Sequence, residues 1–164
     1  MLFNSNVPII DLRGDIMIEI YTDGSCSVNS GKGGWGLVIV EDGKVIREEC
    51  GAAFDTTNNR MELTAFLKAM QIMDESEGEL YYTIYTDSAY IANCFKDKWY
   101  QKWLANGWKA SNRTAIKNQD LWKLILKLHR ESRHHVTIVH VKGHNGNAYN
   151  ERADVLATSW RGMI

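Results

Sequence analysis

Residues 16–25 read IMIEIYTDGS, and isoleucine occupies every second position from 16 to 20. This period of two predicts a β-strand that begins at Ile16 and ends near Asp23. A second apolar run over residues 80–86 ends in the same Tyr-Thr pair and is followed by Asp87. The motifs YTDGS at 21–25 and YTDS at 85–88 therefore place a carboxylate at the end of each of two predicted strands.

The apolar patterns outside these two runs predict an α/β fold. The predicted strands are 16–23, 33–40, 45–54, 80–86 and 136–141. The predicted helices run from a cap among residues 56–59 to Gly78, then over 88–95, 97–107, 119–130 and 150–160. The Asp42-Gly43 pair between two strand-like runs is typical of a hairpin. Because a crossover connection joins parallel strands, we expect a five-stranded mixed sheet with its first three strands antiparallel and helices on both faces.

Composition excludes several classes of protein. The chain has 164 residues, of which 45% are hydrophobic and 24% charged, a balance typical of a globular domain. The net charge of −1 excludes binding of nucleic acid through bulk charge alone. Three cysteines without a CxxC motif favour neither a disulfide framework nor a zinc knuckle, so we expect a reducing cytoplasm. No apolar run reaches the roughly 18–20 residues of a membrane span.

The chain is expected to hold one domain over residues 16–164, preceded by a flexible N-terminal extension over residues 1–15. We find no oligomerisation signal and expect a monomer.

Four acids stand at informative positions in the predicted elements. Asp23 and Asp87 end neighbouring strands, Glu62 lies about one turn into the long helix, and Asp154 lies in the last helix. Any one of these acids alone is ordinarily a helix cap or a solvated turn residue. Carboxylates that cluster repel one another unless cations or protons neutralise them. Oxygen-rich sites suit Mg²⁺ or Mn²⁺, and two such ions support in-line phosphoryl displacement.

Five motifs are spread across the chain: TDGSC at 22–26, TTNNRMEL at 56–63, YTDS at 85–88, VKGH at 141–144 and NERAD at 150–154. In order and spacing this set resembles the motifs of bacterial type 1 ribonuclease H. The resemblance covers about residues 17–160 and implies an endoribonuclease that cleaves the RNA strand of RNA–DNA hybrids. It also implies two-metal-ion catalysis that leaves 5′-phosphate and 3′-hydroxyl ends, with two Mg²⁺ ions that Mn²⁺ can replace.

The resemblance also implies roles for individual residues. The metal-binding catalytic carboxylates are Asp23, Glu62, Asp87 and Asp154, and His144 matches the loop histidine that assists proton transfer or product release. The substrate-binding residues implied in the same way are Asn29, Thr57, Asn58, Asn59, Trp99, Trp103 and Asn118. Trp108 matches the family as well, and we interpret it as structural.

Residues 96–117, called the handle below, carry a net charge of +5, whereas the rest of the chain carries −6. Trp99 and Trp103 are spaced to share one helix face. This face either contacts sugars and bases of a nucleic acid or packs inward. The segment resembles the basic protrusion of the family, which grips the DNA strand. Its tip over 104–107 has fewer cations than is usual, which predicts weaker and more salt-sensitive binding of a hybrid.

Three departures from the family pattern concern substrate affinity. Asp55 stands where an arginine is frequent, Ala89 stands where a glutamine is frequent, and the turn over 28–34 lacks the usual prolines. Two other functions stay open: a non-catalytic hybrid-binding module, and a nuclease or integrase of the same fold that acts on DNA. The intact carboxylates argue against the first, and the handle with the NNRMEL and NERAD motifs argues against the second.

Overall fold

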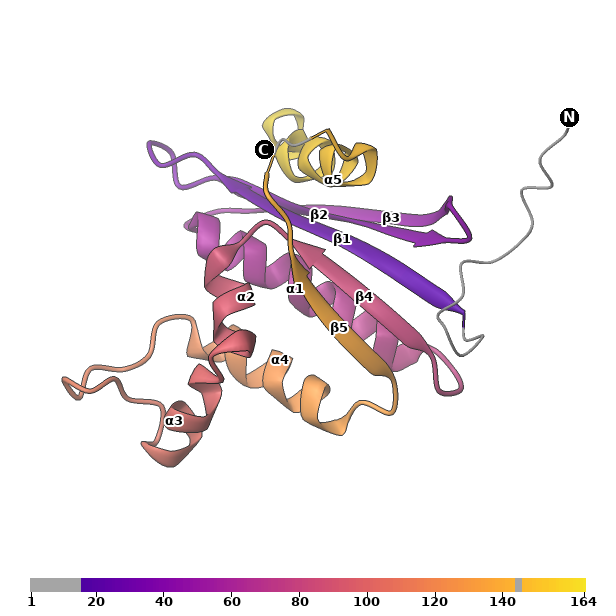
Figure 1. Cartoon of the computed structure of the whole chain (residues 1–164). Coiled ribbons are helices and arrows are strands. Elements are labelled where there is room, and N and C mark those ends of the chain that lie inside the picture. The colour runs from indigo at the N-terminus through magenta and orange to yellow at the C-terminus, as the bar shows by residue number, and fades with distance from the viewer. Residues whose placement is uncertain (1–15, 144–145) are drawn as a thin grey trace, which may run out of the picture.

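The structure is a computed structural model that describes residues 16–143 and 146–164. Its centre is a five-stranded sheet in the order β3-β2-β1-β4-β5 (Figure 1). The strands are β1 (Met17–Cys26), β2 (Gly33–Glu41), β3 (Lys44–Ala53), β4 (Tyr81–Thr86) and β5 (His135–His140). Strand β2 is antiparallel to β1 and β3, whereas β4 is parallel to β1 and β5. The predicted mixed sheet is confirmed.

Helices cover both faces of the sheet, as predicted. They are α1 (Asn58–Glu75), α2 (Ala89–Lys96), α3 (Trp99–Ala105), α4 (Gln119–Glu131) and α5 (Ala148–Thr158), followed by the 3-10 turn η1 (Ser159–Gly162). Helix α5 lies on one face over β1 and β2, with η1 after it, and α1 packs on the other face together with α4 (Figure 1). None of these helices, within the described ranges, is both long and apolar enough to cross a membrane.

The larger core lies between the sheet and α1. Because side chains alternate along a strand, β1 turns Ile18 and Ile20 toward α1. They pack in one cluster with Phe66 of α1 and Trp122 of α4, both of which have no exposed surface. This cluster fixes α1 across the middle of the sheet and so fixes the height at which its first turns meet the strand ends.

The smaller core lies under α5. Tyr21, Val38 and Val40 project to this face and pack with Ala153 of α5. The ring of Tyr21 stacks on that of Tyr85 from β4, with 4.5 Å between the ring centroids. The stack ties β1 to β4 directly behind the two aspartates that end these strands.

The boundaries of several elements differ from the prediction for local reasons. Strand β1 continues to Cys26 because its last residues pair with β2 as far as Gly33. Helix α1 ends at Glu75, before the predicted stop at Gly78. Helix α5 begins at Ala148, two residues early, because the Asn147 side chain caps it by accepting hydrogen bonds from two backbone N–H groups.

Two glycines bring helices unusually close to the sheet. A Cβ placed on Gly24 of β1 would lie 2.2 Å from the backbone nitrogen of Glu62 in α1. A Cβ on Gly36 of β2 would lie 2.7 Å from the carbonyl oxygen of Ala153 in α5. Any larger residue at either position must displace a helix backbone. These contacts therefore set the positions of α1 and α5, one on each face.

Substituting Gly36→Ala is expected to destabilise the protein by about 1–3 kcal/mol, because the added methyl group overpacks the contact between β2 and α5. Urea unfolding measures this change in the free energy of unfolding. Gly162→Ala is the matched control, since a Cβ there meets no atom within 4 Å. Equal stability of the two variants would contradict the close approach of α5.

Candidate active site

Asp23 and Asp87 lie side by side at one edge of the sheet. The parallel register pairs Tyr21 with Tyr85 and Thr22 with Thr86, so the next residue on each strand is one of the two aspartates. The Thr22 hydroxyl also donates a hydrogen bond to the Tyr85 carbonyl oxygen at 3.2 Å. The predicted convergence of the two strand ends is confirmed, and this is the edge at which open α/β sheets bind ligands.

Two helices add further carboxylates to this edge. Glu62, in the second turn of α1, places a carboxylate oxygen close to oxygens of Asp23 and Asp87, and all three atoms lie within 4.8 Å of one another. Asp154 of α5 lines the same hollow, called the carboxylate cleft below, which has a volume of about 460 Å³. Among the residues that the structure describes, the lining consists of Asp23, Gly24, Ser25, Asn58, Asn59, Glu62, Asp87, Ser88, Ala89, Tyr90 and Asp154.

The cleft disfavours negative charge on the carboxylates that it gathers. Burial raises the pKa of Asp23 to about 7, with a further contribution from the charge of Asp87. Burial, and then the charges of Asp23 and Asp87, raise the pKa of Glu62 well above its usual range. The Gly24 N–H donates to Asp23 Oδ1 at 2.9 Å, which is too little to offset these effects.

The donor set fits a hard divalent cation. All of the convergent groups are carboxylates, the ligands that Mg²⁺ and Mn²⁺ prefer. Glu62 Oε2 is buried and has no hydrogen-bond partner among the residues that the structure describes. A buried carboxylate oxygen without a partner is costly, and a bound cation removes that cost. Asp23, Glu62, Asp87 and Asp154 are the residues that would hold it.

A second hollow adjoins the carboxylate cleft. It is lined by Thr57, Asn58, Asn59, Lys117 and Asn118, has a volume of about 420 Å³, and is called the amide hollow below. Asn58 and Asn59 line both hollows. The structure thus brings together four of the residues predicted to bind substrate, and Lys117 adds a cation beside them.

The remaining predicted residues lie elsewhere. Asn29 is exposed in the turn between β1 and β2 and lines neither hollow. His144 lies outside the described residues, and its role stays a prediction. Ser25, Ser88 and Tyr90 line the cleft, although the sequence analysis did not single them out. The two serines follow the aspartates in the quoted motifs, which was a usable signal, whereas Tyr90 had none.

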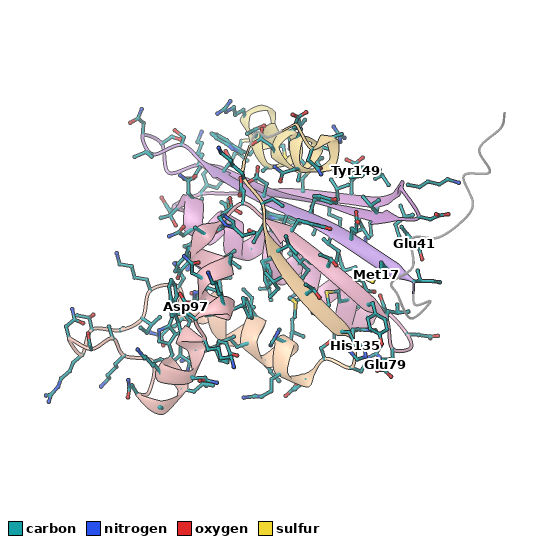
Figure 2. All side chains as sticks on the ribbon, in the orientation of Figure 1. Met17, Glu41, Glu79, Asp97, His135 and Tyr149 are labelled. Carbon is teal, nitrogen blue, oxygen red and sulfur yellow. The ribbon has the colours of Figure 1, made fainter. Side chains whose placement is uncertain are left out.

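The handle projects away from the sheet, with α3 at its outer part (Figure 1). Asp97, its single acid, lies at the turn between α2 and α3 (Figure 2). Its six cations are all exposed, as a binding surface for phosphates requires. They are Lys96, Lys98, Lys102, Lys109, Arg113 and Lys117.

The aromatic face of the handle is less open than the sequence suggested. Trp103 is only 9% exposed, because its side of α3 turns toward Trp122 of α4 and joins the main core. Of the two arrangements considered for this face, Trp103 adopts the inward one. Trp99 is half-buried and lies next to Tyr90 of the cleft, with 6.2 Å between the ring centroids. Of the two predicted tryptophans, Trp99 has the surface to meet a ligand.

Comparison with known proteins agrees with this geometry. The RNase H family model matches residues 15–161. A ribonuclease H of Chlorobium luteolum is 46% identical over 140 residues, which cover 85% of this chain and 92% of that protein. A ribonuclease H of Acetivibrio thermocellus is 45% identical over 142 residues, which cover 86% of this chain and 92% of that protein.

The chain belongs to the ribonuclease H family.

Solved structures extend the likeness to the fold. The crystal structure of LC9-RNase H1, a type 1 RNase H with the type 2 active-site motif, superposes with a TM-score of 0.77 at 29% identity, covering 90% of this chain and 72% of that chain. A foamy viral protease-reverse transcriptase in complex with dsDNA shares the fold at a TM-score of 0.73 and 22% identity, with coverage of 90% and 94%. The type 1 ribonuclease H family that the five motifs indicated is confirmed, and with it a nuclease.

Removing the Asp23 carboxylate is expected to stabilise this ribonuclease H when divalent cations are absent. The folded-state pKa of Asp23, about 7, exceeds its ordinary value of 3.8, so the folded chain holds an extra proton between these values. Stability therefore falls as the pH rises from about 4 to 7, and the full cost is present above pH 7. In EDTA, Asp23→Asn should raise the free energy of unfolding by about 1–3 kcal/mol at pH 8 and hardly at pH 4.

Urea unfolding over this pH range measures the effect. Asp74→Asn, which removes an exposed carboxylate near the end of α1, is the control and should lack the gain in stability expected for Asp23→Asn at pH 8. An Asp23→Asn variant that is less stable than the wild type at pH 8 would contradict the repulsion.

Proposed function

We propose that this ribonuclease H hydrolyses the RNA strand of RNA–DNA hybrids with divalent cations bound by Asp23, Glu62, Asp87 and Asp154. The observation that carries the proposal is the carboxylate cluster: oxygens of Asp23, Glu62 and Asp87 lie within 4.8 Å of one another, and Asp154 lines the same open cleft. The cations are two Mg²⁺ ions, which Mn²⁺ can replace. The cleavage products carry 5′-phosphate and 3′-hydroxyl ends.

The four carboxylates form a site whose side chains need to move little when cations bind. Bound divalent cations supply Lewis acidity for the phosphoryl oxygens and an activated water. Asp23 and Asp87 are held by adjacent strand ends, Glu62 by α1 and Asp154 by α5, so the four groups come from rigid elements. His144 is proposed to assist proton transfer or product release, on the strength of its sequence motif.

Amide side chains beside the cleft suit recognition of a hybrid. Asn58 and Asn59 are exposed at the start of α1 and line the cleft next to Glu62. An amide both donates and accepts hydrogen bonds, as contact with the 2′-hydroxyl groups of the RNA strand requires. We extend this role to Asn29, in the exposed turn between β1 and β2.

The DNA strand is proposed to cross the amide hollow and continue to the handle. Thr57 and Asn118 in the hollow supply uncharged donors for one phosphate, and Lys117 adds a charge. The exposed cations of the handle neutralise further phosphates. Trp99 offers its accessible ring face to a sugar or base. Asp55 is exposed where the family often has arginine, so this hollow depends more on its neutral donors.

We also infer that the protein acts as a monomer in the cytoplasm. Cys26, Cys50 and Cys94 are free thiols, as in a reducing compartment.

Cleavage is expected to depend on the buried glutamate and not on an exposed one of the same helix. Glu62→Gln removes a charged cation ligand, which supplies several kcal/mol of transition-state stabilisation, so the rate should fall by at least about 10³-fold. Glu75→Gln changes an exposed residue at the end of α1 and should leave the rate unchanged. A labelled RNA–DNA hybrid with Mg²⁺ or with EDTA measures both.

RNA–RNA, DNA–DNA and single-stranded RNA serve as substrate controls. Cleavage of the hybrid alone, lost with EDTA and with Glu62→Gln, is the expected result. Binding of the hybrid without cleavage in Mg²⁺ would favour the non-catalytic binding module, and cleavage of duplex DNA would favour a DNA nuclease of the same fold.

Binding of the hybrid is expected to depend on salt through individual lysines. Lys117→Gln should weaken binding and reduce the slope of log Kd against log salt concentration by about 0.7–0.9, the loss of one phosphate contact. Lys44→Gln, at the far end of the sheet from the cleft, is the control and should leave the slope unchanged. Fluorescence anisotropy from 50 to 300 mM salt measures both slopes, and equal slopes for Lys117→Gln and wild type would contradict the contact.

A further inference from the structure

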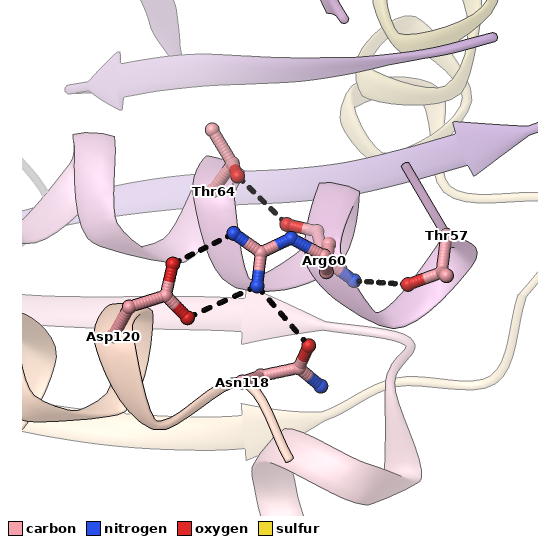
Figure 3. A network of polar contacts seen from close by, with 5 residues as sticks. All are labelled: Thr57, Arg60, Thr64, Asn118 and Asp120. Carbon is pink, nitrogen blue, oxygen red and sulfur yellow. Dashed lines mark hydrogen bonds and ion pairs between the residues drawn. The ribbon is translucent and has the colours of Figure 1, made fainter. Parts of the chain in front are cut away.

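Arg60 of α1 forms a polar network with Asn118 and Asp120 at the start of α4 (Figure 3). Its guanidinium donates to both carboxylate oxygens of Asp120, at 3.0 and 2.8 Å. The same guanidinium donates to Asn118 Oδ1 at 3.3 Å. Arg60 itself does not line the hollow, whereas Asn118 does. The network therefore touches the hollow only through Asn118 and through Thr57, whose hydroxyl caps α1 by accepting from the Arg60 N–H.

The network determines which end of the Asn118 amide faces Arg60. A guanidinium has five N–H donors and no acceptor, so only the oxygen of an amide can contact it. With Oδ1 turned to Arg60, the NH₂ group of Asn118 is left as a pair of donors. A phosphate has only acceptors, so this is the orientation that an anion site requires.

The backbone around Asn118 indicates that its side chain serves something other than helix capping. Asn118 is the N-cap residue of α4, and asparagine at this position ordinarily accepts a hydrogen bond from the first turn. Within the described residues, the Asn118 side chain makes no such bond. Its backbone also has a φ of 61°, in the left-handed region. The amide is thus diverted from α4 toward α1, where Arg60 holds it.

We propose that Arg60 is a positioning residue that, anchored by Asp120, fixes the Asn118 amide with its NH₂ donors presented to a phosphate of the bound DNA strand. The inference rests on the proposed function. It assigns a role to Arg60, which contacts none of the four carboxylates of the cleft and does not line the amide hollow. Lysine cannot replace it, because a single ammonium group does not hold a carboxylate in two places and an amide in a third. Asp55 stands where the family often has an arginine, so the amide hollow lacks that positive charge. Binding of a phosphate there depends more on the oriented Asn118 amide.

A double-mutant cycle on hybrid binding tests the coupling, with EDTA present so that no cleavage occurs. Asn118→Ala and Arg60→Gln should each raise Kd about tenfold, the loss of one hydrogen bond to a charged group. The double variant should bind within about twofold of Arg60→Gln alone, and Arg60→Lys should not restore binding. In steady-state cleavage with Mg²⁺, Arg60→Gln should raise KM with little change in kcat. Arg47→Gln, which breaks an exposed ion pair with Glu49 on β3, is the matched control and should change none of these.

Side-chain amide NMR tests the positioning without any hybrid. The Asn118 NH₂ group should be ordered in the wild type and in Arg47→Gln, and mobile in Arg60→Gln. The inference would be overturned if the increases in Kd of the two single variants multiply in the double variant. It would also be overturned if the Asn118 amide is as ordered in Arg60→Gln as in the wild type. A wild type that does not bind a hybrid, but whose Asn118 amide depends on Arg60, would instead refute the proposed function and leave the positioning standing.

Discussion

Helices α1 and α5 contact the sheet from opposite faces at almost the same point, and the site depends on this double contact. Gly24 receives the backbone of α1 at Glu62, and Gly36 receives the backbone of α5 at Ala153. Gly36 is also the register partner of Asp23. Gly24 therefore brings Glu62 of α1 to the end of β1 from one side of the sheet. Gly36 brings α5, and with it Asp154, from the other side. The carboxylate cleft is a consequence of backbone packing, and its acids cannot move apart without loss of both cores.

The close packing of these carboxylates lowers the stability of the fold, and bound cations would offset this loss. Burial and mutual repulsion raise the pKa of Asp23 to about 7 and that of Glu62 well above its usual range. Hydrophobic residues of similar size at these positions would stabilise the fold, so the acids cost stability, and a bound divalent cation would offset that cost. The neighbouring amide hollow differs in charge from the carboxylate cleft: its side chains offer hydrogen-bond donors, and Lys117 gives it a positive charge. In the proposed function, the carboxylates of one hollow would hold the cations and the donors of the other would contact a phosphate.

Local patterns in the sequence were enough for much of this account. Isoleucine alternation located β1, and the repeated Tyr-Thr-Asp motif placed Asp23 and Asp87 at adjacent strand ends. Glu62 and Asp154 joined the site only through family resemblance, because nothing local says where a helix residue lies across a sheet. Long-range packing decides the inward turn of Trp103, which the sequence left open, and the diversion of Asn118 toward Arg60, which no local pattern indicated. The positions of both side chains depend on where α4 packs, and the hydrophobic pattern of the sequence does not predict that.

We infer that the carboxylate cleft exists to bind divalent cations. Crystals of the protein soaked in Mn²⁺ test it most directly, because anomalous diffraction locates manganese independently of any assay. We expect an anomalous peak within coordination distance of Asp23, Glu62 and Asp87, which should be lost in Glu62→Gln crystals treated in the same way. Manganese bound only elsewhere on the surface, with the cleft free of anomalous signal, would contradict it.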